Sequence, residues 1–180
     1  MTIEELVRQA REAGFLTALV EPEQIPVDPK FRSYCQDNLC GKYNANYACP
    51  PACGTAEQLH GRLLEQQYIL ILEKLWPIRG YEDKQAMACA RRAHNAAVLA
   101  LMEAARAGGF DGFSCGYNGC PLCEPCRQTA GEPCPFPDKR ISCMSAFCVD
   151  VAELARRCDL PFAWSEERLH LFGMLALHKI

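Results

Sequence analysis

The sequence lacks the features that mark several large classes of protein. It has no excess of positive charge, because 19 lysines and arginines stand against 22 aspartates and glutamates in 180 residues, giving a formal net charge of −3. A chain without a basic surface has little attraction for a phosphate backbone, so we expect no nucleic-acid partner. No apolar run approaches the roughly 20 residues of a membrane-spanning helix, so we expect no membrane association either.

The first residues, Met-Thr-Ile-Glu-Glu, lack both the positively charged stretch and the apolar core of a secretory signal. We therefore expect a cytoplasmic protein. The cytoplasm is reducing, and the number of cysteines is odd, at 13. Both points argue against a scaffold held by disulfides and favour metal binding or redox chemistry for the cysteines.

Common catalytic signatures are also missing. We find no glycine-rich phosphate loop, no His-Glu-x-x-His and no serine nucleophile elbow. The histidines share no metal-ligand spacing with one another or with a cysteine pair, so each is interpreted as a surface or core residue. The sequence leaves open whether the protein is an enzyme, and the chemistry it does indicate lies in its cysteines.

Capping and stop signals predict four helices. Thr2 with Glu5 and Thr55 with Gln58 form capping boxes, and Gly108-Gly109 ends a long alanine-rich segment. The helices are expected from Thr2 to Gly14, Thr55 to about Gln66, Tyr81 to Ala107 and Asp150 to about Arg157.

The apolar segments between these helices predict about four strands. Tyr68 to Leu72 is continuously apolar and extends towards Trp76, which is typical of a buried strand. The others are expected over Phe15–Val20, Phe110–Phe113 and Leu169–His178, where Gly173 marks a bulge or a close backbone approach. Helices alternate with strands, so we predict an α/β fold: one domain, residues 1–180, with a sheet of about four strands, flanking helices, and cysteine-rich loops between the elements.

The second cysteine region, Cys115 to Cys134, carries the most specific motif. Cys120, Cys123 and Cys126 have the C-x2-C-x2-C spacing of bacterial [4Fe–4S] proteins, while Cys115-x4-Cys120-x2-Cys123 has the plant-type [2Fe–2S] spacing. Cys134 precedes a proline, as the fourth bacterial ligand does, but seven residues separate it from Cys126 rather than three. We favour one [4Fe–4S] cluster on Cys120, Cys123, Cys126 and Cys134, with Cys115 as a spare or substitute.

Zinc is the competing metal for this region. A structural zinc site normally uses two separated cysteine pairs, so a third cysteine in the run is surplus for a single zinc ion. Buried thiols without a metal would scatter along helices and strands instead of clustering.

The first cysteine region spans Cys35 to Cys53. Its spacings match no standard ferredoxin or zinc pattern, so the metal and core interpretations both stay open from spacing alone. Its members are Cys35, Cys40, Cys49 and Cys53.

Together the two regions resemble the domain of unknown function 2284 family, prokaryotic proteins described as predicted metal-binding. The resemblance covers most of the chain and is carried by Cys40-Gly-Lys-Tyr, Cys49-Pro-Pro, Gly119-Cys120-x2-Cys123-x2-Cys126 and Pro133-Cys134. It implies no established reaction. It implies metal ligation by Cys35, Cys40 and Cys49 in the first region and by Cys120, Cys123, Cys126 and Cys134 in the second.

Four further cysteines lie outside the pattern of that family: Cys53, Cys115, Cys143 and Cys148. Cys53 could complete a second four-cysteine site with Cys35, Cys40 and Cys49, so we hypothesise one cluster site in each region. The favoured function is an iron–sulfur protein that exchanges electrons with a redox partner protein. The alternatives are a zinc-binding structural or interaction module, and an enzyme whose cluster keeps one iron site open for substrate.

Overall fold

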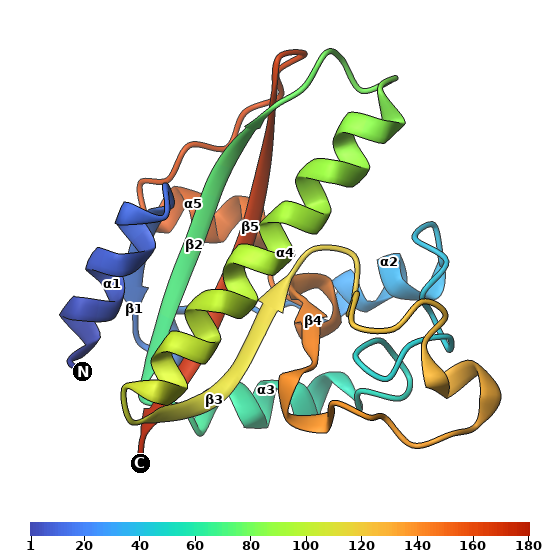
Figure 1. Ribbon diagram of the computed structural model, residues 1–180, viewed down its shortest axis with the longest axis horizontal. Coiled ribbons are helices and arrows are strands. Elements are labelled where there is room, and N and C mark those ends of the chain that lie inside the picture. The colour runs from blue at the N-terminus through green and yellow to red at the C-terminus, as the bar shows by residue number, and fades with distance from the viewer.

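The computed structural model describes residues 1–180 and contains a mixed sheet of five strands in the order β1-β2-β5-β3-β4 (Figure 1). All neighbouring strands are antiparallel except β3 and β4, which are parallel. The α/β class predicted from the sequence is confirmed, with five strands rather than four. The strands are β1 Leu16–Val20, β2 Tyr68–Pro77, β3 Phe110–Gly116, β4 Ile141–Cys143 and β5 Arg168–Lys179.

The strand that the sequence did not predict is β4. Three residues are too few to show an alternating pattern, and β4 exists because the end of β3 offers a free edge on which Ile141, Ser142 and Cys143 pair. For the same reason β3 runs on to Gly116, past the predicted end at Phe113. The prediction that the cysteines lie in loops is therefore wrong for Cys115 and Cys143, which lie in strands, and for Cys35, which lies in a short helix over Arg32–Gln36.

Five α-helices surround the sheet, and both predicted capping boxes are present. The long helix begins at Lys84 rather than Tyr81, because the Asp83 side chain caps it by accepting a hydrogen bond from Ala86 N at 2.9 Å. The short α2, which contains Cys35, was not predicted. No helix is both long and apolar enough to cross a membrane. The helices are α1 Ile3–Glu12, α2 Arg32–Gln36, α3 Ala56–Leu64, α4 Lys84–Ala107 and α5 Val151–Arg157.

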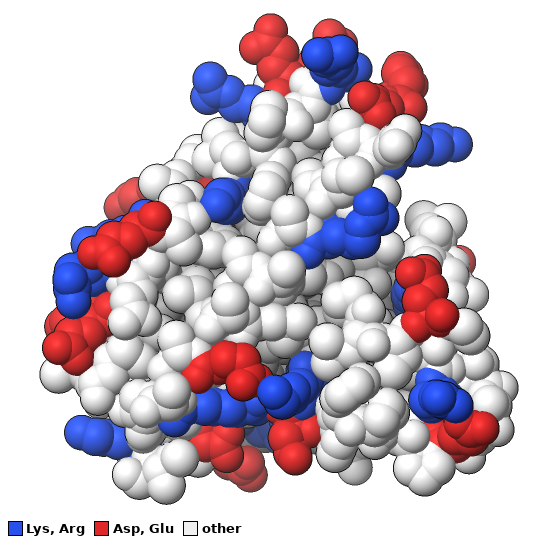
Figure 2. All heavy atoms as spheres, in the orientation of Figure 1, with Lys and Arg blue, Asp and Glu red and all other residues white.

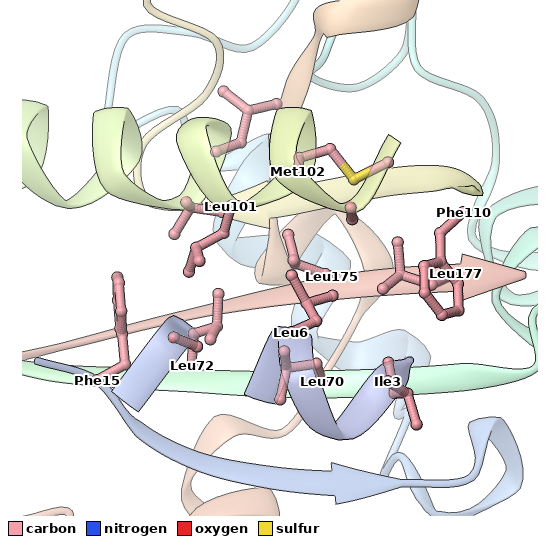
Figure 3. Close-up of a cluster of buried hydrophobic side chains, with 14 of the residues drawn as sticks. Ile3, Leu6, Phe15, Leu70, Leu72, Leu101, Met102, Phe110, Leu175 and Leu177 are labelled. Carbon is pink, nitrogen blue, oxygen red and sulfur yellow. The ribbon is translucent and has the colours of Figure 1, made fainter. Parts of the chain in front are cut away.

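The sheet is covered on both faces. On one face α1 and α4 pack over Leu70 and Leu72 of β2 and Leu175 of β5, with Leu6 and Leu101 pointing into the same cluster (Figures 1 and 3). On the other face, α3, α5 and a 3-10 turn, η5 (Met144–Phe147), cover the alternate side chains of β2 and β5. This two-sided cover explains why β2 is a continuous apolar run rather than an alternating one.

Gly173 in β5 is a close backbone approach, one of the two roles predicted for it. A Cβ atom there would lie 2.8 Å from the Cys115 carbonyl oxygen and 3.0 Å from Val98 Cγ2 of α4. The pairing register of β5 with β2 continues through this residue, so no bulge is present. The missing side chain lets α4 lie directly against the strands that lead to the cysteines.

On the face drawn in Figure 2, basic and acidic side chains are interspersed, and large uncharged areas separate them. No part of this face gathers charge of a single sign.

Candidate metal centre

The two cysteine regions, separated in sequence, lie together beside α2 and β4 (Figure 1). Polar side chains of the first region bind the backbone of the second. Asn46, with 1% of its surface exposed, donates through Nδ2 to the Cys120 carbonyl at 2.9 Å, and its Oδ1 accepts from Ala48 N at 2.9 Å. The Tyr47 hydroxyl donates to the Glu132 carbonyl at 2.7 Å. The structure therefore joins the two regions into one unit.

The second region places its four predicted ligands around one small cavity of about 10 Å³. Burial raises the pKa of the Cys120 thiol, while the backbone N–H groups of Leu122 and Ile141, which face its sulfur, act in the opposite direction. Cys120 is buried, and the other three thiols are partly exposed. The cysteines that line this small cavity are Cys120, Cys123, Cys126 and Cys134.

The first region forms a much larger cavity of about 410 Å³, rimmed by aromatic rings that include Tyr34, Tyr43 and Phe172. Three of the four thiols predicted for this site line it. The fourth, Cys53, lines a different cavity with Leu59 and Phe113. The cysteines around the large cavity are Cys35, Cys40, Cys49 and Cys143.

Two thiols of the large cavity are hydrogen-bonded to each other. The bond from Cys143, with a smaller contribution from the Arg32 guanidinium, lowers the pKa of Cys35 to about 7. The same bond, together with burial, raises the pKa of Cys143. Burial raises the pKa of Cys49 to about 12, and the neighbouring Cys40 adds to the effect. Cys35 is therefore the thiol of this cavity that ionises most readily.

The other cysteines stand outside both thiol sets. Burial raises the pKa of Cys53 and of Cys148. Each thiol is hydrogen-bonded to the Arg32 side chain, which acts on the pKa in the opposite direction. Cys115 is fully buried in β3, and burial raises its pKa strongly. Cys89 is exposed on α4, and Cys158 lies at the end of α5.

An asparagine side chain and a glycine without one shape the loop that connects β3 to the second region. Asn95 of α4 accepts from Tyr117 N at 2.8 Å and donates to the Tyr117 carbonyl at 2.7 Å. Gly119 follows with φ +78°, and a Cβ atom there would lie 2.9 Å from Cys49 Sγ. The sulfur of the first region thus sits in the space left by a glycine of the second.

A buried carboxylate behind the large cavity was not identified from the sequence. Glu73 of β2 has no exposed surface, and its Oε1 lies 2.6 Å from Nδ1 of His170, which lines the cavity. Burial raises the pKa of Glu73, and the hydrogen bond to His170 partly offsets this. Its Oε2 has no partner. The available signal was a glutamate that directly follows the buried Ile-Leu-Ile-Leu run of β2.

A model of the family described as "Predicted metal-binding protein (DUF2284)" matches residues 18–177. The chain belongs to this family. No curated protein and no solved structure shows significant similarity to it. The family description supports metal binding and specifies neither the metal nor a reaction.

For a member of this family, the donor sets fit a thiophilic metal. Each cavity is lined by four thiols, and thiolates select zinc, copper(I) or iron–sulfur clusters over hard cations such as magnesium. No three histidine, cysteine, aspartate or glutamate side chains already stand close enough together to hold one metal ion. Binding therefore requires the thiols of a cavity to turn towards a common centre, which loops permit more readily than strands.

Proposed function

We propose that the second region binds a [4Fe–4S] cluster and that the protein exchanges electrons with a redox partner protein. The observation that carries the proposal is the convergence of four thiols, spaced as in iron–sulfur proteins, on one small cavity. The proposed ligands are Cys120, Cys123, Cys126 and Cys134.

The surroundings of Cys120 support this assignment. Backbone N–H groups directed at a ligand sulfur favour its thiolate and tune the reduction potential of an iron–sulfur centre. Leu122 and Ile141 supply two such groups. Such a cluster supplies one-electron chemistry when bound. The partly exposed Cys123, Cys126 and Cys134 would then form the side through which a partner exchanges electrons.

Zinc binding is the second candidate, and one observation favours it. A space of about 10 Å³ is the size of a single ion, whereas four irons with four sulfides require the loop to open. Four thiolates would also close a tetrahedral zinc shell. In that case the region would be a structural or interaction module without a redox role.

Metal analysis of anaerobically purified protein separates these candidates. An iron–sulfur protein is brown, absorbs broadly near about 400 nm, and contains iron and sulfide in equal amounts. We expect Cys126→Ser to lose that absorbance from the second region and Cys89→Ser, changed on the exposed surface of α4, to keep it. Colourless protein with about one zinc per chain, lost in Cys126→Ser, would replace the iron–sulfur proposal with the zinc candidate.

A further inference from the structure

We propose a second metal centre in the large cavity, bound by Cys35, Cys40, Cys49 and Cys143, with Cys143 in the place that the sequence suggested for Cys53. It is separate from the site of the proposed function and does not depend on it. The ligand we infer is a thiolate-bound polynuclear centre, of which an iron–sulfur cluster is the chemical class.

The fold brings Cys143 to this cavity from a distant part of the chain. Cys143 ends β4 and directly precedes η5, against which α2 packs with Cys35. An antiparallel bridge between Val27 and Val149 fixes the segment before α2 onto the segment after η5. Since both sides of this contact are held by backbone pairing, the approach of Cys35 to Cys143 is a property of the fold.

The two thiols are also direct neighbours. Cys35 and Cys143 are hydrogen-bonded to each other. The N–H of Ala146 faces the sulfur of Cys143, as N–H groups face the sulfurs of bound clusters.

Cys53 is near the site but is directed elsewhere. It lines the neighbouring cavity with Leu59 and Phe113 and is hydrogen-bonded to Arg32. To act as a ligand it would have to leave that guanidinium and turn out of the neighbouring cavity. Cys143 already lines the large cavity and has only to turn towards its centre.

The size and lining of the cavity indicate the class of ligand. A volume of about 410 Å³ is far more than one ion requires. Apolar and aromatic side chains, including Tyr43 and Phe172, line the cavity, and the thiols of Cys35 and Cys49 are buried in its wall. The Sγ of Cys49 fills the space beside Gly119, so that thiol is held at the cavity wall.

The deciding experiment compares Cys143 with Cys53 in the unmodified protein. Anaerobically purified protein is alkylated with iodoacetamide before and after chelation, and mass spectrometry measures labelling at each cysteine. We expect Cys143 to be protected at least about tenfold before chelation and labelled after it, whereas Cys53 should label at the same rate in both states. Equal labelling of Cys143 with and without metal, or metal-dependent protection of Cys53 instead, would overturn the proposal.

Variants in a Cys126→Ser background give an independent readout. The Cys126→Ser protein should still contain the iron and sulfide of the large cavity. Adding Cys143→Ser should remove them, whereas adding Cys53→Ser should leave them in place. Far-ultraviolet circular dichroism checks that each variant is folded. Loss in Cys53→Ser with retention in Cys143→Ser contradicts the inference. If Cys126→Ser alone removes no metal, the proposed function fails while the Cys143 assignment still stands on its own labelling result.

Discussion

The small and the large cavity are each lined by four thiols, but these thiols come from different parts of the chain. The second region takes all four from one loop, and they surround a cavity of about 10 Å³. The large cavity of about 410 Å³ takes its thiols from α2, a loop and β4. A local motif can be found from spacing alone, whereas a site assembled across the sheet depends on the fold. The difference also predicts unequal dependence on metal, because the four thiols of the second region all lie in one loop, whereas Cys35 and Cys143 of the large cavity lie in α2 and β4.

We expect the largest difference between the two regions when metal is removed, measured as the rate at which trypsin cleaves each of them. We expect chelation to loosen the second region and to leave the sheet folded, because the two large apolar clusters do not include that loop as a whole. Trypsin should then cleave after Arg127 roughly tenfold faster than before, with a much smaller change after Lys42 in the first region. Mass spectrometry of timed digests measures both rates.

Cys126→Ser is the matched control for this experiment. Its cleavage after Arg127 should be fast from the start and insensitive to the chelator. Equal acceleration after Lys42 and Arg127 would show that both regions depend on metal alike, and the proposed difference between them would be wrong.

The next largest effect tests the connection between the regions. Asn46→Ala removes the bond to the Cys120 carbonyl and the bond from Ala48 N, leaving both groups buried. Leaving the Cys120 carbonyl and the Ala48 N–H buried without these hydrogen bonds should lower the free energy of unfolding by about 2–3 kcal/mol. Tyr47→Phe, which removes only the exposed bond to Glu132, should cost less than about 1 kcal/mol. Urea denaturation measures both, and equal costs would mean that Asn46 does not join the regions.

Several features of the fold could be predicted from the sequence because they are local. Thr2, Thr55 and Asp150 cap helices as expected, and the apolar run of β2 is a buried strand. What could not be predicted depends on partners far along the chain. The strand β4 exists only through β3, and the position of Cys143 beside Cys35 depends on the bridge from Val27 to Val149.

A third prediction concerns pH, since only the large cavity has a buried carboxylate behind it. Burial raises the pKa of Glu73 in the folded chain, so between its ordinary value of about 4.5 and that raised value the folded state binds more protons than the unfolded state. The free energy of unfolding should therefore fall as pH rises through this window, by about 1.4 kcal/mol for each unit of pKa difference. The urea midpoint of unfolding, measured across this pH window, should not fall in Glu73→Gln. It should fall as in the unchanged protein in Glu82→Gln, which alters an exposed glutamate.

The smallest effect concerns the reactivity of Cys35 in metal-free protein. With a pKa of about 7, Cys35 should react with iodoacetamide at pH 7.5 before Cys49, whose pKa is about 12. Cys143→Ala removes the hydrogen bond that stabilises the Cys35 thiolate. Its pKa should rise towards 9, and labelling should slow by about threefold, because the higher nucleophilicity offsets part of the lost thiolate.

Cys143→Ser keeps a hydroxyl donor at the same position and is the control. Its Cys35 should label at a rate close to that of the unchanged protein. Slow labelling in both variants would show that the hydrogen bond from residue 143 is not the cause of the low pKa.

The bridge between Val27 and Val149 has a consequence for the order of events during synthesis. Roughly 90 residues separate Cys49 from Cys143, which a ribosome needs about 5–20 s to add. Throughout that interval the early thiols lack the wall that encloses them in the finished protein. The thiols of residues 120–134, by contrast, emerge within about 1–3 s of each other, at about 5–20 residues per second. The late-closing cavity is therefore the one whose cysteines spend longest open to oxidation or to capture by free metal in the cell.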